Sequence, residues 1–378
     1  GNHTLLGGVQ GYFTRLRETG LYVISAEDEK TSPYYGVPYT SIGKKHANEV
    51  GFFVQDEWNV TPKLTVVPGI RVDSHSSGEE YATSVKVSDS AFPTTKFSKT
   101  TVNPRIAIKY ELTPSLVLRA NVGTGFRAPY GFSEDLHLCS GSPRVWKSSN
   151  LKGERAISYN LSADYYAKKY QFSINIFRTN LKDKIQFSPA DDEVKKFGYS
   201  YQWENVDDAY VQGVELGAKA NLFRNFNAGI NWTFNQGKFK HERADWSDPN
   251  DETVKEFPQR LQYAKDSRNI SRFPAMTGDI DLDYTPGTWT FSLTSSLQGR
   301  MFIDYNSEDD GATSKIKKTN TFMIFNCRAA KRFGTCTVYA GAKNIFSYIQ
   351  DEKHTDDAAF MYAPVYGATW YVGLSVKL

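Results

Sequence analysis

The sequence predicts an all-β fold, a transmembrane antiparallel β-barrel, and three observations support this fold class. First, segments of about ten residues alternate apolar and polar side chains, as strands between lipid and water do. In Ala156 to Tyr165, every odd position from Ile157 on is apolar or aromatic and the even positions are polar. Second, short and long connectors alternate along the chain, and third, aromatic residues make up 14% of it. A soluble sandwich would also alternate, but the order of the connectors and the aromatic surplus favour a barrel.

Composition excludes two other classes of protein. The chain has 378 residues, with 45 Lys and Arg against 42 Asp and Glu, which gives a net charge of +3. This near balance indicates no nucleic-acid partner. The mean hydropathy is −0.51, and no run approaches the roughly 18 apolar residues that a spanning helix requires. A helical membrane protein is therefore excluded, whereas a tilted barrel strand needs only about 10 residues.

We expect 14 strands, with boundaries placed where the alternation begins and stops. In chain order they cover residues 3–16, 46–60, 64–74, 101–112, 116–125, 154–167, 170–187, 201–220, 226–239, 274–285, 288–303, 318–332, 335–348 and 366–378.

The connectors between these strands form two populations. The short ones carry Pro, Gly, Asn or charged residues, as tight turns require. An even number of strands would leave the C-terminus on the short-turn side, which is periplasmic in bacterial barrels. The short connectors are 61–63, 113–115, 168–169, 223–225, 286–287 and 333–334, and the long ones are 17–45, 75–100, 126–153, 188–200, 240–273, 304–317 and 349–365.

One expected strand carries a carboxylate at every second position. Asp279, Asp281 and Asp283 would therefore share one face of the sheet. Three carboxylates on one face would be costly in a packed core but are readily hydrated in a wet lumen. The pattern predicts a polar face turned towards water.

The three cysteines do not form a disulfide scaffold. Cys139 stands alone in a long connector, whereas Cys327 and Cys336 flank the short connector at 333–334. A disulfide across this hairpin and two free thiols are both compatible with the sequence, because a shift of register would separate the two sulfur atoms.

The sequence contains partial matches to catalytic and cofactor-binding motifs, but each lacks a residue or an element that the motif requires. Gly123 to Ala128 matches a dinucleotide-binding fingerprint, but Pro129 interrupts the helix that would have to follow. The zinc-protease pattern fails after His241, and no G-x-S-x-G is present. The carboxylates of Asp191 to Glu193 have no aromatic cleft around them. We therefore expect neither an enzyme nor a cofactor.

Some connectors contain residue types that bind metals. His137 lies between Asp135 and Cys139, and a loop can fold such residues around one ion. The acidic segments 247–252 and 308–311 have oxygen ligands of the kind that Ca²⁺ prefers. Exposed loop histidines and solvated loop tips have the same composition, and this interpretation is favoured. We assign no metal site and keep His137 as the one candidate ligand.

Aromatic and basic residues in the long connectors are candidate ligand contacts, since such side chains commonly anchor bound molecules. For each aromatic, a place in the interfacial girdle is the alternative. The candidates are Tyr34, Tyr35, Tyr39, His137, Arg144, Trp146, Trp246 and Tyr362.

A series of motifs, in one order along the chain, resembles the barrel of TonB-dependent outer-membrane receptors. The motifs are Phe52 to Trp58, Leu64 to Asp73, Asn103 to Arg105, Gly125 to Pro129, Asn150 to Glu154, Gln212 to Leu216 and Lys343 to Phe346.

The resemblance implies a multi-pass transporter of the bacterial outer membrane. The family's barrel has about 22 strands around an N-terminal plug, so residues 1–378 would be its C-terminal part, without plug and early strands. The implied partners are the TonB-ExbB-ExbD complex, reached through the missing plug, outer-membrane lipid, a small-molecule metal chelate and a surface lipoprotein. Leu378 stands where the family's assembly signal has an aromatic residue.

The resemblance also implies a scarce cargo, with a ferric siderophore or haem first. His137 lies between two motifs, as a ligating His does in haem receptors, although Ser149 replaces the Pro of the second motif. Import of a corrinoid such as vitamin B12 or of a glycan is the alternative, as is a passive 14-strand channel. An outer-membrane hydrolase would need a Ser-His pair on the outer wall, and the expected strands contain no His beyond their first residues.

Overall fold

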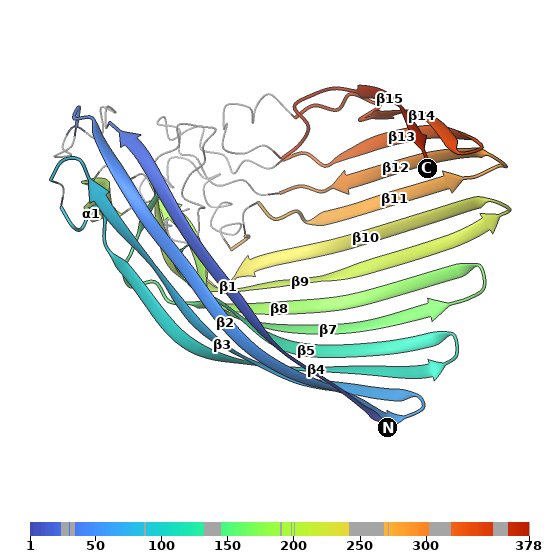
Figure 1. Cartoon of the computed structure of the whole chain (residues 1–378), viewed down its shortest axis with the longest axis horizontal. Coiled ribbons are helices and arrows are strands. Elements are labelled where there is room, and N and C mark those ends of the chain that lie inside the picture. The colour runs from blue at the N-terminus through green and yellow to red at the C-terminus, as the bar shows by residue number, and fades with distance from the viewer. Residues whose placement is uncertain are drawn as a thin grey trace, which may run out of the picture. The chain divides into compact units, whose positions relative to one another are not determined.

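The structure, a computed structural model, describes residues 1–23, 30, 35–86, 88–131, 145–189, 191–197, 199, 201–241, 268–270, 272–301, 319–350 and 362–377. Their strands belong to one sheet, in which fourteen strands follow one another in chain order (Figure 1). The expected path of 14 strands and the all-β class are confirmed. The ladders from β1 to β3 and from β10 to β15 are antiparallel.

The fourteen strands of the path correspond one to one to the expected segments. They are β1 His3–Tyr22, β2 Tyr39–Thr61, β3 Leu64–Thr83, β4 Thr95–Thr113, β5 Leu116–Arg127, β7 Glu154–Tyr166, β8 Tyr170–Pro189, β9 Tyr201–Phe223, β10 Phe226–Phe239, β11 Met276–Tyr284, β12 Trp289–Gln298, β13 Phe322–Phe333, β14 Cys336–Lys343 and β15 Thr369–Val376.

By compactness the chain divides into two units. Unit 1 contains Gly1–Ile108, Asn121–Ser158 and Thr179–Ala209, and unit 2 contains Lys109–Ala120, Tyr159–Arg178 and Tyr210–Leu378.

Several boundaries differ from the expectation on the side of the long connectors. β1 continues to Tyr22 rather than residue 16, and β2 begins at Tyr39 rather than residue 46. β3 continues to Thr83 and β4 begins at Thr95, so both reach into the expected connector 75–100. Backbone pairing continues there although the apolar alternation has ended, because a hairpin in water needs no lipid-facing side chains.

One strand was not expected. The short β6, Val145–Lys147, lies off the main path and pairs in parallel with β9, Val145 opposite Tyr201 and Lys147 opposite Trp203. Three residues carry no readable alternation, so the sequence could not reveal this pairing. β6 brings the end of the connector 126–153 against the sheet within unit 1.

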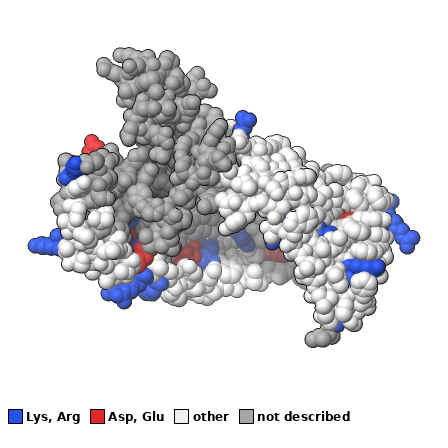
Figure 2. Space-filling model, turned by 90° about the horizontal axis from the view of Figure 1, so that it is seen from above, with Lys and Arg blue, Asp and Glu red and all other residues white. Residues whose placement is uncertain are grey.

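The sheet has an apolar face and a polar face. In unit 1 the exposed apolar residues Phe52 and Val54 on β2 and Ile70 and Val72 on β3 lie at alternate positions. The same alternation continues in unit 2, and its β8 members are Tyr170, Phe172, Ile174 and Ile176. Exposed apolar area of this extent is rare on soluble proteins and is what contact with hydrocarbon requires. Broad uncharged areas of the described surface are visible in Figure 2.

The short connectors have the turn chemistry that the sequence predicts. Asn225, Gly287 and Gly334 have φ angles of 65°, 61° and 59°, the left-handed region that Asn and Gly tolerate. The Thr61 hydroxyl accepts hydrogen bonds from the amides of Lys63 at 3.2 Å and Leu64 at 3.0 Å.

Two open questions of the sequence are resolved. Cys327 and Cys336 are free thiols, because Cys327 lies opposite Ala342 while Cys336 lies opposite Phe333. The acidic segment at 191–193 begins the short helix α1, Asp192–Lys195, and the Asp191 carboxylate caps it by accepting a 2.9 Å hydrogen bond from the Val194 amide. No helix among the described residues is long and apolar enough to cross a membrane.

The alternation of apolar and polar faces predicts that a charged substitution has different effects on the two faces. Ile157 on β7 is an exposed residue of the apolar face, whereas Asn160 belongs to the polar face. Ile157→Arg should cost about 2–4 kcal/mol of folding free energy near the membrane midplane, and Asn160→Arg should cost little. The measurement is unfolding of the complete protein in lipid vesicles, and equal losses in the two variants would contradict this assignment of faces.

Candidate functional site

The polar face of unit 1 concentrates charged side chains on one strand. Arg71, Asp73, His75, Ser77 and Glu79 occupy alternate positions of β3, so all five point to the same face. Four of them, Asp73, His75, Ser77 and Glu79, are buried. They form two connected groups, a network around Arg71 and an anchor around Glu79.

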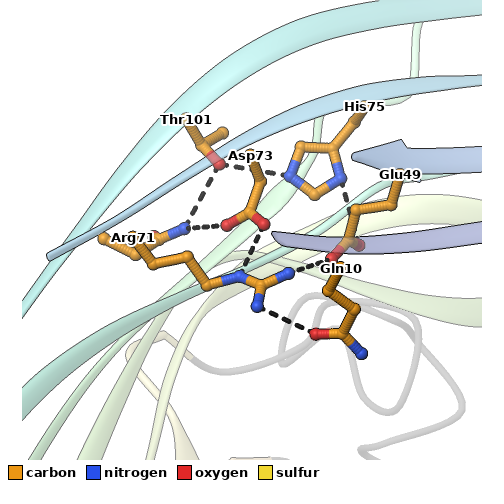
Figure 3. A network of polar contacts seen from close by, with 7 residues as sticks. Gln10, Glu49, Arg71, Asp73, His75 and Thr101 are labelled. Carbon is orange, nitrogen blue, oxygen red and sulfur yellow. Dashed lines mark hydrogen bonds and ion pairs between the residues drawn. The ribbon is translucent and has the colours of Figure 1, made fainter. Parts of the chain in front are cut away.

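Arg71 is the centre of the first group, the Arg71 network (Figure 3). Its Nε donates to Asp73 Oδ1 at 2.5 Å and its Nη2 donates to Glu49 Oε1 at 3.0 Å. Its Nη1 donates to Gln10 Oε1 at 2.9 Å. One guanidinium thus links side chains of β1, β2 and β3, and its planar fork fixes their orientation.

β4 closes the network on the other side of β3. Asn103 Nδ2 donates to Asp73 Oδ2 at 3.1 Å, and the Thr101 hydroxyl lies 3.1 Å from His75 Nε2. The second ring nitrogen of His75 lies 3.4 Å from Glu49 Oε2. Each carboxylate therefore has two partners, as the buried charge of Asp73 requires.

Thr101, His75 and Glu49 have the residue order of a hydrolytic triad, but their surroundings do not favour that chemistry. Thr101 and His75 are only 6% and 5% exposed. The Thr101 hydroxyl also lies 3.3 Å from the Asn103 amide nitrogen, and the His75 ring packs 4.9 Å from the ring of Phe126. A buried hydroxyl with these neighbours leaves no space for a substrate carbonyl. The expectation that no His lies deep in a strand was wrong, because β3 extends past His75.

Gly51 makes room for the Arg71 network. It lies opposite Asp73 in the β2–β3 ladder. A Cβ atom there would lie 2.2 Å from Asp73 Oδ1 and 2.4 Å from Arg71 Nη2. The ion pair between Arg71 and Asp73 therefore occupies the space above the Gly51 backbone.

Glu79 forms the second group, the Glu79 anchor. Its Oε1 accepts from Lys147 Nζ at 2.7 Å and from the Gly131 amide at 3.2 Å, and its Oε2 accepts from the Tyr81 hydroxyl at 2.8 Å. The side chains of Lys147 and Glu79 are 3% and 0% exposed. Gly131 and Lys147 flank residues 132–144, so one carboxylate ties both ends of that segment to β3.

Tyr130 reinforces this attachment. Its hydroxyl donates to the Ser148 carbonyl at 2.7 Å and accepts from the Leu151 amide at 3.0 Å. The ring packs in a buried cluster with Leu151, Ile185 and Trp203. Burial, with a smaller contribution from the negative charge of Glu79, raises the pKa of Tyr130 to about 12. The phenol therefore stays a hydrogen-bond donor at physiological pH.

The structure describes four of the predicted ligand residues. Tyr39 is the first residue of β2 rather than a loop residue, and it is only 1% exposed. Tyr39 and Ala91 form a core cluster, against which Tyr35, Phe92 and Phe197 pack. Binding by Tyr35 and Tyr39 remains a prediction, since their observed contacts are with this cluster.

Trp146 and Tyr362 belong to separate clusters. The Trp146 indole donates to the Ser90 carbonyl at 2.9 Å, and its ring packs against the core pair Val194 and Tyr199. Tyr362, in unit 2, packs against buried Met301. Tyr34, His137, Arg144 and Trp246 lie outside the described residues, and their roles also remain predictions.

Sequence reasoning missed the two polar groups for one reason. The expected third strand ended at residue 74, so His75 and Glu79 were assigned to a connector. The alternation of charged and small side chains from Arg71 to Glu79 was a usable signal, because a polar face preserves the period of two after the apolar face ends. Among the described residues no cluster of His, Cys, Asp and Glu has the arrangement of a metal site.

The fold and the polar face lead to the comparison with known proteins. The family described as "TonB dependent receptor-like, beta-barrel" matches residues 1–345. The chain belongs to this family. The expected resemblance is confirmed, and with it a family of outer-membrane receptors and transporters rather than enzymes.

Similar proteins within the family cover much of this chain. The vitamin B12 transporter BtuB of Photobacterium profundum is 26% identical over 266 residues, which are 68% of this chain and 36% of that protein. The ferric enterobactin receptor PirA of Pseudomonas aeruginosa is 20% identical over 357 residues, 88% of this chain and 42% of that protein. This receptor chain thus spans less than half the length of both relatives.

A solved structure gives the same result for the fold. The ferric yersiniabactin uptake receptor FyuA of Yersinia pestis superimposes with a TM-score of 0.66 at 15% identity, covering 98% of this receptor chain and 49% of that one.

The Glu79 anchor makes a prediction about the segment it holds. Lys147→Met would leave the Glu79 carboxylate buried without its cation, which typically costs about 3–5 kcal/mol. We expect faster proteolytic cleavage between residues 131 and 145, measured on the folded receptor. Replacing both partners, Glu79→Gln with Lys147→Met, should restore part of the protection.

The matched control is Lys152→Met, at the same end of the segment. The Lys152 side chain is 73% exposed and lies 3.9 Å from Asp183, so its removal should change little. Identical cleavage rates for Lys147→Met and Lys152→Met would reject the anchoring role.

Gly51 provides a second prediction. Gly51→Ala should destabilise the receptor by about 1–3 kcal/mol, because the new methyl group must displace the Arg71–Asp73 pair. Gly123→Ala is the control, since a Cβ there meets no atom closer than 3.6 Å. Denaturant unfolding in detergent compares the two, and a Gly51→Ala variant as stable as the control would contradict the close packing.

Proposed function

We propose that the complete protein imports a scarce metal chelate, a ferric siderophore or haem, across the bacterial outer membrane. Membership in the TonB-dependent receptor family over residues 1–345 carries this proposal. Among the named relatives, PirA is a ferric enterobactin receptor and FyuA a ferric yersiniabactin uptake receptor. The cargo class is inferred from these relatives.

The polar face is suited to such a passage. Arg71 holds Glu49 and Asp73 through hydrogen bonds, so a polar chelate meets fixed dipoles rather than mobile side chains. Asp279 accepts from Asn231 at 2.8 Å and Asp283 from Ser292 at 2.5 Å, which extends this polar character within unit 2. A lumen lined in this way favours hydrophilic cargo over apolar molecules.

We propose that energy and closure come from parts of the protein outside residues 1–378. The chain spans 36% and 42% of its two named relatives, so we assign residues 1–378 to the C-terminal part of the barrel. An N-terminal plug would close the lumen, and the TonB-ExbB-ExbD complex would act on it. A surface lipoprotein is a further proposed partner.

A corrinoid is the second candidate cargo. The relative with 26% identity is a vitamin B12 transporter, and a corrinoid is also a metal chelate too large for passive diffusion through a narrow pore. Glycan import and a passive 14-strand channel have no comparable observation in their favour.

Uptake of labelled compounds by a bacterial strain tests the cargo. The complete receptor is expressed in cells that lack their own iron and corrinoid receptors, and uptake of radiolabelled ferric siderophores, haem and cyanocobalamin is measured. We expect uptake of one iron compound, lost when tonB is deleted. Uptake of cyanocobalamin instead would select the second candidate, and uptake without TonB would reject active import.

Haem has a separate spectroscopic readout. If haem is the cargo, His137→Ala should change the absorption spectrum of the haem complex, because an axial imidazole determines it. An identical spectrum would remove His137 as the ligand.

A further inference from the structure

A groove lies on the apolar face of unit 2, where the sheet runs from β10 to β15. Its volume is about 570 Å³. Cys327 and Ala329 of β13 and Ala340 of β14 form its floor, while Phe291 of β12 and Trp370 of β15 stand at its sides. β12 and β15 are separated by three strand spacings, or about 14 Å.

The register explains why a groove forms there. Phe291 lies opposite Ala329, and Ala329 lies opposite Ala340, so one row across the sheet changes from a large side chain to two methyl groups. The next row has Leu293 opposite Cys327. Large side chains on both flanks and small ones on the two middle strands leave a channel along the strands.

The polar residues beside the groove belong to the other face. Arg328 alternates with Cys327 and Ala329 on β13, and its guanidinium packs 4.6 Å from the Tyr339 ring. Ser292 lies opposite Arg328 and donates to Asp283. The surface within the groove is therefore apolar, which suits a hydrocarbon chain.

A cation stands at the short-turn end of the same face. Lys331 is two residues beyond Ala329 on β13, so both side chains point to the apolar face. Its Nζ lies 4.7 Å from the Trp289 ring and 5.1 Å from the Phe333 ring. Within the described part of the chain, no carboxylate forms an ion pair with it.

A lysine on a lipid-facing strand is costly unless its charge reaches the water or the head groups of the interface, and an anionic head group there adds an attraction. The aromatic neighbours Trp289 and Phe333 mark that interface, as aromatic girdles do in outer-membrane barrels. A phosphate of a membrane lipid is the anion available at this depth.

We propose that this groove is a binding site for an anionic phospholipid. One acyl chain lies over Ala329 and Ala340, between Phe291 and Trp370, and the phosphate pairs with Lys331. Because short turns of bacterial barrels face the periplasm, the lipid belongs to the periplasmic leaflet. The site is independent of the cargo and depends only on the membrane location of the family.

Lipid retention tests the site on the complete receptor. The protein is purified in detergent and incubated with dioleoyl phosphatidylglycerol or dioleoyl phosphatidylcholine, and bound lipids are counted by native mass spectrometry. We expect preferential retention of phosphatidylglycerol. Lys331→Gln should weaken phosphatidylglycerol binding about fivefold and leave phosphatidylcholine unchanged.

A second variant addresses the groove itself. Ala340→Phe should fill the floor and reduce retention of both lipids, whereas Ile176→Phe introduces the same side chain on the apolar face of β8, outside the groove, and should change nothing. Heat-modifiable gel mobility confirms folding of each variant. If Ala340→Phe does not fold, the headgroup preference of Lys331→Gln decides.

Three results would overturn the proposal. They are equal retention of both lipids by the unchanged receptor, retention unaffected by Lys331→Gln, and a receptor dimer that Ala340→Phe dissociates. The last would make a second copy of the chain the occupant. Cargo uptake by the same variants is measured separately, so a failure of the import proposal leaves the lipid result interpretable.

Discussion

The structure depends on one constraint, that a chain crossing hydrocarbon must pair its backbone polar groups within the protein. Unpaired N–H and C=O groups cost several kcal/mol each in lipid, and neighbouring strands satisfy them. The fourteen strands that follow one another from β1 to β15 meet this requirement by pairing in chain order. Every side chain then has only two directions available, and the alternation of Ile157, Tyr159 and Leu161 with polar residues follows from it.

The same pairing of strands places charged side chains together on the polar face of the sheet. Charged groups are accommodated there because each has several hydrogen-bonding or ionic partners. Arg71 bridges three strands through Gln10, Glu49 and Asp73. Glu79, without exposed surface, is satisfied by Lys147, Gly131 and Tyr81. The Glu79 anchor connects a long connector to the sheet.

The apolar face has a specificity of its own. Most of its residues only need to be apolar. The rows around Ala329 and Ala340, however, form a groove, and Lys331 adds a positive charge at one end. Outer-membrane receptors are usually considered from their lumen and loops. A shaped groove facing lipid connects this chain to the composition of the leaflet around it, independently of what it transports.

Local chemistry was sufficient to predict much of the fold from the sequence. The period of two identified all fourteen strands of the path, and the turn residues Asn225, Gly287 and Gly334 placed their connectors correctly. Family motifs identified the receptor class. These features depend on residues within a few positions of one another, so the sequence determined them by itself.

Long-range register decided the rest. Only the tertiary structure shows that β3 continues through His75 and Glu79, that β6 pairs with β9, and that Tyr39 is buried. It also separates Cys327 from Cys336, which a different register would have brought together. Each of these depends on which residue stands opposite which on another strand. Backbone hydrogen bonds are alike in every register, so turn geometry and side-chain packing between strands set that alignment, and the pattern within one segment does not reveal it.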